Sequence, residues 1–114
     1  MEERRIAKRR NLIFYLQVFD NKTDELLGFA VDITHEGLMM LSNKAIVTEK
    51  MFQLRMTLPE QLSDKSQVTF AAQSIWCKQD VNTDYFDTGF QLIEVEPETL
   101  SVITQLITHF GFKD

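Results

Sequence analysis

Apolar and polar side chains alternate at every second position over most of residues 12–95, and this period constrains the fold more than any other feature of the sequence. A period of two is what a β-strand with one buried and one exposed face produces. Six stretches have this pattern and are predicted to be strands: LIFYLQVF (12–19), LLGFAVDI (26–33), GLMMLS (37–42), MFQLRMTL (51–58), QVTFAAQSIWCKQ (67–79) and YFDTGFQLIEV (85–95). In the fifth stretch, strict alternation predicts four inward-facing residues: Val68, Phe70, Ala72 and Trp76.

The period changes after Glu96, where apolar residues recur at helical spacing. They form one face of a predicted helix over 97–110: Leu100, Ile103, Leu106, Ile107 and Phe110. Pro97 suits the first helical position, and Gly111 suits the stop. Six short strands followed by one helix predict an all-β fold with one helix, namely a six-stranded antiparallel β-barrel plus a C-terminal α-helix.

Size and composition predict one soluble domain. The 114 residues, 44% hydrophobic and 25% charged, are enough for one compact core. Cys77 is the only cysteine, which excludes an intramolecular disulfide and a cysteine-based zinc site. Because no apolar run suits a signal peptide or a membrane span, we expect a cytoplasmic protein without a membrane partner.

Basic residues are concentrated in ERRIAKRRN (3–11), at the start of a chain whose net charge is −5. Residues 1–10 contain five basic and two acidic side chains, whereas residues 11–114 contain seven and 15. Residues 11–114, which we call the acidic body, argue against binding of long nucleic acids, because such binding needs many cations along a groove. Two interpretations of the basic segment stay open: a solvated arm, or a site for a compact anion.

Arg5 and Arg9 are four residues apart, so their side chains lie on one side of the segment whether it is helical or extended. Two guanidinium groups suit a phosphate or the O6/N7 edge of guanine, because arginine forms forked, charge-assisted hydrogen bonds. By itself, however, a basic cluster is more often a solvated arm.

The stretch DITHEG (32–37) lies at the junction of two predicted strands. Asp32 and Thr34 face the same way if strand geometry continues through them. A carboxylate can orient an arginine or accept a guanine N–H, a hydroxyl can donate to phosphate, and Gly37 lets backbone approach a ligand closely. Other interpretations are that Asp32 caps an ordinary turn, and that His35 either lines a site or points to solvent.

Together, RIAKR (5–9) and DITHEG (32–37) resemble the two-part signature of the PilZ domain family, R-x-x-x-R followed by [D/N]-x-S-x-x-G. The resemblance spans almost the whole chain, and it includes the tryptophan of the fifth strand and TGFQLIEVEPE (88–98). It implies one domain over 1–114, with a flexible basic N-terminal segment (1–11), a barrel (12–95) and a helix (97–110).

The resemblance also implies that the chain binds the bacterial second messenger cyclic di-GMP, changes conformation on binding and signals to a protein partner. The matching positions are the arginine pair Arg5 and Arg9, which would contact guanine and phosphate, and the second-motif residues Asp32, Thr34 and Gly37. Arg4 precedes the first motif, where a basic residue in similar proteins accompanies uptake of an intercalated ligand dimer. Thr34 replaces the usual serine; its added methyl group predicts weakened or shifted affinity rather than loss.

Two alternatives remain. One is an adaptor with the same barrel that acts through protein contacts without nucleotide, and Thr34 is the feature in its favour. The other is an OB-like barrel for single-stranded nucleic acid, which conflicts with the acidic body. No enzyme, metal or cofactor is expected, because phosphate-loop, nucleophile and dinucleotide motifs are missing, and His35 and His109 make no ligand set.

Overall fold

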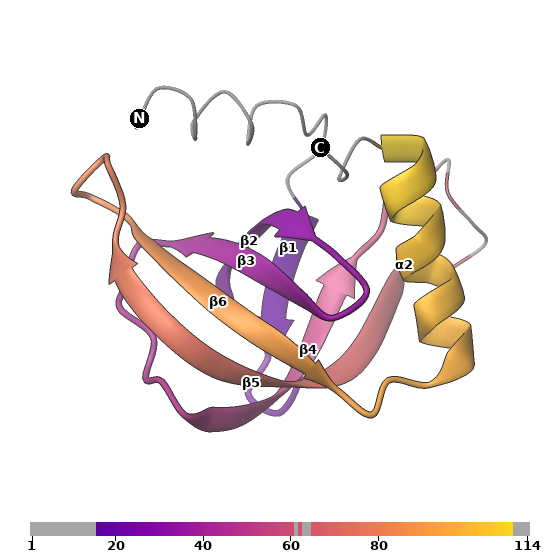
Figure 1. The fold of residues 1–114 in the computed structure, drawn as a ribbon, viewed down its shortest axis with the longest axis horizontal. Coiled ribbons are helices and arrows are strands. Elements are labelled where there is room, and N and C mark those ends of the chain that lie inside the picture. Colours follow the sequence, from indigo (N-terminus) through magenta and orange to yellow (C-terminus); the bar gives the residue numbers. More distant parts are fainter. Residues whose placement is uncertain (1–15, 61, 63–64, 111–114) are drawn as a thin grey trace.

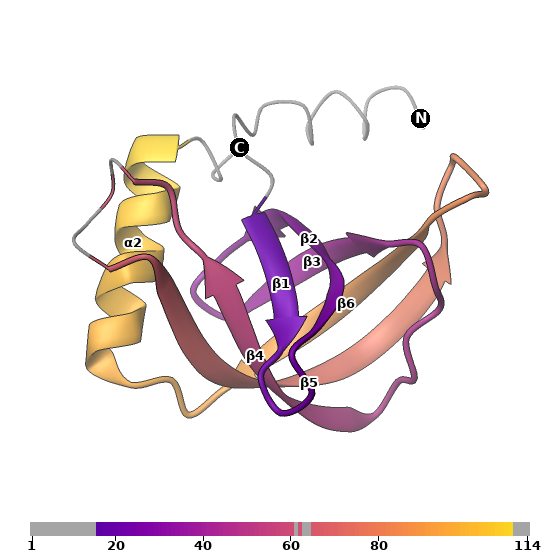
Figure 2. The same ribbon diagram turned by 180° about the vertical axis from the view of Figure 1, so that it is seen from behind.

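The computed structural model describes residues 16–60, 62 and 65–110. Six strands close into an antiparallel barrel in the spatial order β1-β2-β3-β6-β5-β4, and one helix packs at an end of it (Figure 1, Figure 2). The elements are β1 (Leu16–Asp20), β2 (Glu25–Ile33), β3 (Gly37–Ser42), β4 (Lys50–Thr57), β5 (Gln67–Gln79), β6 (Phe86–Ile93) and α2 (Pro97–Phe110). The predicted fold class is confirmed.

Most element bounds agree with those predicted. β3, β5 and α2 begin and end at the predicted residues, β2 begins one residue earlier, and β4 is shifted by one. β6 was predicted to reach residue 95 but ends at Ile93, because Glu94 adopts a left-handed φ of 47° that a strand cannot contain. Residues 12–15 of the first predicted strand lie outside the described residues.

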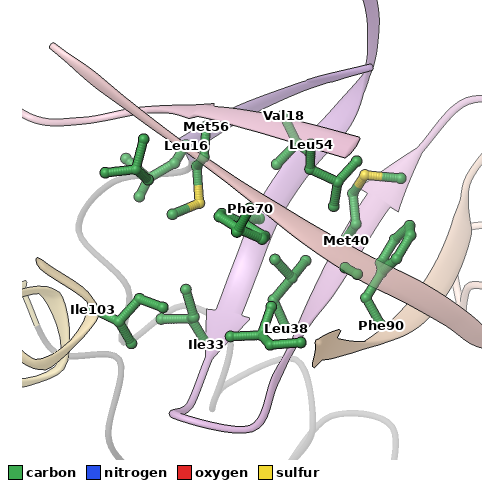
Figure 3. Close-up of a cluster of buried hydrophobic side chains, with 14 of the residues drawn as sticks. Leu16, Val18, Ile33, Leu38, Met40, Leu54, Met56, Phe70, Phe90 and Ile103 are labelled. Atoms are coloured by element: carbon green, nitrogen blue, oxygen red, sulfur yellow. The ribbon is translucent and has the colours of Figure 1, made fainter. Parts of the chain in front are cut away.

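The barrel interior is filled by side chains from every strand, as the alternation predicts (Figure 3). In β4, for example, Phe52, Leu54 and Met56 are buried while Gln53 is exposed. The helix buries Val102, Ile103 and Leu106 against the barrel, and Figure 3 shows Ile103 beside Ile33 of β2. Helix and barrel therefore share one apolar core.

Two of the three β-bulges between described strands change the facing of residues discussed below. In β2, Ala30 pairs with Met40 and Asp32 pairs with Met39, so Val31 is an extra residue. In β5, Ser74 pairs with Phe90 and Trp76 pairs with Gly89, so Ile75 is extra. After each bulge, the inward–outward alternation of side chains in the rest of the same strand is shifted by one residue.

The prediction that Trp76 faces the core is wrong, because the β5 bulge interrupts the alternation on which it rested. Val68, Phe70 and Ala72, which precede the bulge, are buried as predicted. Trp76 follows it and is 40% exposed. The single tryptophan of the chain therefore lies on the outer surface of the barrel.

Candidate functional site

One row of side chains crosses the outer face of four neighbouring strands. Asp32 of β2 pairs with Met39 of β3, Met39 pairs with Gly89 of β6, and Gly89 pairs with Trp76 of β5. Directly opposed residues in such a row have Cβ atoms roughly 5 Å apart. The barrel register thus places the Asp32 carboxylate and the Trp76 indole at the two ends of this row, with Met39 and Gly89 between them.

A cavity of about 280 Å³ lies on this outer face. Its lining includes three residues of the predicted site, Asp32, Thr34 and Gly37, together with Trp76 of β5. The other lining residues are Ile33, Leu38, Met39, Ile75, Gly89 and Phe90. We call this cavity the outer-face cavity. It has an apolar floor with polar groups at one edge, which is typical of small-molecule sites.

Asp32, in β2, and Thr34, the first residue after β2, both lie exposed and line the cavity on the outer face. The bulge at Val31 is what allows this: Ala30 and Val31 are both buried, and the next residues resume alternation in the opposite phase. A regular strand would have turned Asp32 inward, the same way as Ala30. Bulges commonly re-aim side chains in this manner beside functional sites.

Residues 34–37 form a tight turn between β2 and β3, which we call the 34–37 turn. The Thr34 backbone N–H donates to the Gly37 carbonyl oxygen at 2.8 Å. The Thr34 hydroxyl accepts the backbone N–H groups of Glu36 and Gly37, each at 3.2 Å. The side chain that caps this turn is therefore Thr34, whereas the sequence left open that Asp32 did so.

Two glycines make room within the site. A Cβ atom on Gly37 would overlap the Phe90 carbonyl oxygen of β6, so this glycine is required for the close approach of β3 to β6. A Cβ atom on Gly89 would overlap the Trp76 indole. The indole therefore lies directly over Gly89 and fills the space that a side chain would take.

The connection between β3 and β4, together with the first residue of β4, forms hydrogen bonds with the residues on both sides of the β5 bulge. The Ser74 hydroxyl, fully buried, donates to the Val47 carbonyl oxygen at 2.6 Å and accepts the Lys50 N–H at 3.2 Å. On the other side of the bulge, the Cys77 thiol accepts the Ile46 N–H at 3.4 Å. These bonds fix both residues that flank Ile75 and Trp76, which orients the indole outward.

Trp76 is the cavity residue that sequence reasoning missed, although one signal pointed to it. Under unbroken alternation Lys78 would share the inner face with Val68, and an unpaired lysine is not tolerated in a barrel core. A phase change before Lys78 was therefore required. In the structure Lys78 is exposed, and its Nζ lies 5.6 Å from the centre of the Trp76 ring.

The remaining predicted site residues differ in where they lie. Arg4, Arg5 and Arg9 fall outside the described residues. The sequence left open whether His35 lines the site or points to solvent. In the structure His35 is exposed and hydrogen-bonded to Thr104 of α2. Over residues 16–60, 62 and 65–110, no group of three or more His, Cys, Asp or Glu side chains is arranged to hold a metal ion. Within the same ranges, no helix has the length and apolarity to cross a membrane.

Two solved proteins have a similar fold. The PilZ domain with c-di-GMP of YcgR from Escherichia coli matches with a TM-score of 0.64 and 16% identity, over 84% of this chain and 80% of that chain. The Bacillus subtilis inhibitor of motility, MotI/DgrA, matches with a TM-score of 0.63 and 13% identity, over 82% of this chain. The matched part is 44% of the MotI/DgrA chain, so this chain spans less than half of that protein.

No protein-family model matches the sequence, and no curated protein matches it. The similarity therefore rests on the arrangement of the elements, a closed six-stranded barrel followed by a helix. This is the fold of the PilZ domain of YcgR.

Proposed function

We propose that this PilZ-like domain is a receptor for cyclic di-GMP that signals to a protein partner in the bacterial cytoplasm and catalyses no reaction itself. One observation carries the proposal. Asp32, Thr34 and Gly37, the second-motif residues that the resemblance to the PilZ family indicated, line one cavity together with the outward-facing Trp76.

The chemistry of the cavity suits a guanine nucleotide. Trp76 offers an exposed aromatic face, and stacking of a base on such a face contributes about 1–3 kcal/mol. Asp32 offers carboxylate oxygens, which accept the N–H groups of a guanine edge or orient an arginine. At about 280 Å³ the cavity is near the lower limit of ligand pockets, so it would hold one base while the rest of the ligand lies on the outer face.

The arginine pair would supply the cationic half of the site. β1 begins at Leu16, and Leu16 pairs with Ala30, two residues before Asp32. The segment that contains Arg5 and Arg9 is thus joined to the barrel beside the cavity. Arg9 is seven positions before Leu16, and seven residue steps span at most roughly 23–25 Å. Such a reach would let the arginines bind the two phosphates of a ligand in the cavity.

Thr34 keeps the hydroxyl that the second motif calls for. Its lone pairs already accept two backbone N–H groups, and its own hydrogen points to the Gly37 carbonyl oxygen at 3.4 Å. That last contact is longer than a normal O–H···O hydrogen bond, so the hydroxyl hydrogen remains available to a ligand phosphate. The fold shared with a domain solved with c-di-GMP is consistent with the same ligand here.

An adaptor that acts through protein contacts without nucleotide is the second candidate. The observation in its favour is the same hydroxyl, because the bonds of Thr34 within the 34–37 turn account for this side chain without any ligand. The inhibitor of motility shares the fold at a similar TM-score.

Calorimetric titration with cyclic di-GMP decides between the two candidates, with cyclic GMP and GTP as ligand controls. We expect micromolar or tighter binding that is selective and is lost, by at least about tenfold, in Arg5→Ala and Arg9→Ala. Arg10→Ala is the matched control, because it removes a charge from the same segment outside the motif. The stoichiometry, one or two nucleotides, then tests the role of Arg4.

No heat and no change in Trp76 fluorescence on mixing, in a protein shown to be folded, would exclude the receptor and leave the adaptor. Equal loss in all three arginine variants would indicate general attraction of the ligand to a basic segment rather than a defined site.

A further inference from the structure

The 34–37 turn is held on two sides. Within the turn, the Thr34 hydroxyl accepts the N–H groups of Glu36 and Gly37. On the barrel side, the Leu92 N–H of β6 donates to the Glu36 carbonyl oxygen at 2.8 Å. These bonds fix the start and the end of the turn but leave its outermost residue, His35, to be held by something else.

His35 contacts the helix rather than the cavity. Its Nε2 lies 2.9 Å from the Thr104 hydroxyl oxygen, in the middle of α2 and 69 residues further along the chain. The Thr104 hydroxyl donates its hydrogen to the Leu100 carbonyl oxygen at 3.0 Å. Its oxygen is therefore the acceptor toward His35, which assigns the imidazole hydrogen to Nε2.

Helix α2 is a firm support for this contact. Val102, Ile103 and Leu106 are buried in the shared core, so one face of the helix is fixed against the barrel. Lys65 forms an ion pair with Glu98 in the first turn of the helix. In both views of the fold, the β2–β3 connection points toward the helix (Figure 1, Figure 2).

We infer that His35 is a positioning residue of the binding site, an inference that rests on the proposed function. By donating to Thr104 it fixes the tip of the 34–37 turn against α2, and Thr34 and Gly37 then meet the ligand already in place. Without this bond the tip of the turn is less ordered before the ligand binds, and the cost of ordering it on binding lowers affinity. Because coupling between two sites is reciprocal, an occupied cavity also stabilises the contact with the helix, and α2 becomes the element that a partner can read.

Four single variants and one double variant test this role. His35→Ala and Thr104→Val, alone and combined, remove the bond. His35→Gln keeps an amide N–H near the position of Nε2, and Thr108→Val is the control. Thr108 is an exposed threonine one turn further along α2, so its variant has the same effect on helix propensity. Two quantities are measured, the dissociation constant for cyclic di-GMP by Trp76 fluorescence, and amide hydrogen exchange of Glu36 and Gly37 in the unliganded protein.

We expect His35→Ala and Thr104→Val each to raise the dissociation constant about 3- to 10-fold and to speed exchange at Glu36 and Gly37. The double variant should be no weaker than either single one, because both remove the same bond. His35→Gln and Thr108→Val should match the parent in both measurements.

Unchanged exchange at Glu36 and Gly37 overturns the inference, since the bond would then not order the turn. Faster exchange with unchanged affinity also overturns it, as does additive loss in the double variant. If the parent protein binds no cyclic di-GMP, the proposed function fails instead, and exchange in the unliganded variants alone decides whether His35 holds the turn.

Discussion

Two residues at the floor of the outer-face cavity depend on each other. Trp76 lies over Gly89, and a Cβ atom on Gly89 would overlap the indole ring. Asp32 faces outward because of the bulge at Val31, whereas the position of Trp76 also depends on the absence of a side chain on Gly89 of the neighbouring strand. A single methyl group on Gly89 therefore alters the cavity without removing any polar group.

Gly89→Ala is expected to displace the indole from the cavity floor. The atoms that would clash belong to the Trp76 side chain, so the ring can rotate away at a cost of about 1–3 kcal/mol of unfolding free energy. We expect a red shift of Trp76 emission, because the ring becomes more solvated, together with weaker cyclic di-GMP binding. Thr34→Ser, which keeps the hydroxyl, serves as a control for emission. An emission spectrum identical to the parent in a folded Gly89→Ala variant would contradict this contact.

At the scale of the elements, the β1–β2 turn shows how the barrel is fastened far from the cavity. Asp24 adopts a left-handed φ of 66° within this turn. Arg55 of β4 forms an ion pair with Asp24, donates to the Asn21 side-chain oxygen at 3.2 Å, and lies 4.6 Å from the centre of the Phe19 ring. One guanidinium group thus joins three residues of the β1–β2 hairpin to β4.

Arg55→Lys should lower the free energy of unfolding by about 1 kcal/mol and leave cyclic di-GMP affinity unchanged. Lysine keeps the charge but loses the planar stacking on Phe19 and the second hydrogen bond. The Asp24 carboxylate is largely exposed, which limits what the ion pair contributes. Chemical denaturation and the ligand titration measure the two quantities. A change in affinity at unchanged stability would contradict the view that this cluster is structural.

For the whole molecule, charge divides the sequence into a basic N-terminal segment and an acidic remainder. Residues 11–114 contain 15 acidic and seven basic side chains, whereas five basic side chains lie in the first ten residues. A long polyanion would meet repulsion over most of this surface. A small dianion needs only the basic segment and the outer-face cavity, so the overall charge favours a compact ligand.

Salt dependence of binding tests this division. Two ligand phosphates predict at most about a tenfold loss of cyclic di-GMP affinity between roughly 50 and 200 mM salt, whereas a polymer with 6–10 phosphate contacts loses about 10³–10⁵. Single-stranded DNA is the comparison ligand and should bind weakly at every salt concentration. A steep salt dependence, or tighter binding of the DNA, would favour the OB-like alternative that the acidic body argues against.

Local sequence patterns were enough to locate the elements of this protein and to indicate the chemistry of half of its candidate site. Alternation located six strands and helical spacing located the helix, because both periods depend only on residues a few positions apart in the chain. The same local rule placed Asp32 and Thr34 on one face, and the residue types of the second motif indicated what they can bind.

How distant segments of the chain meet depends on the folded barrel. Whether Trp76 points inward or outward depends on a bulge, and a bulge is a property of pairing with β6 that β5 alone does not contain. β3 and β6 become neighbours only because the barrel closes, and this closure brings Asp32 and Trp76 into one row. His35 meets Thr104 across 69 residues for the same reason. Periodicity is local, whereas register and closure are set by the packing of the whole core.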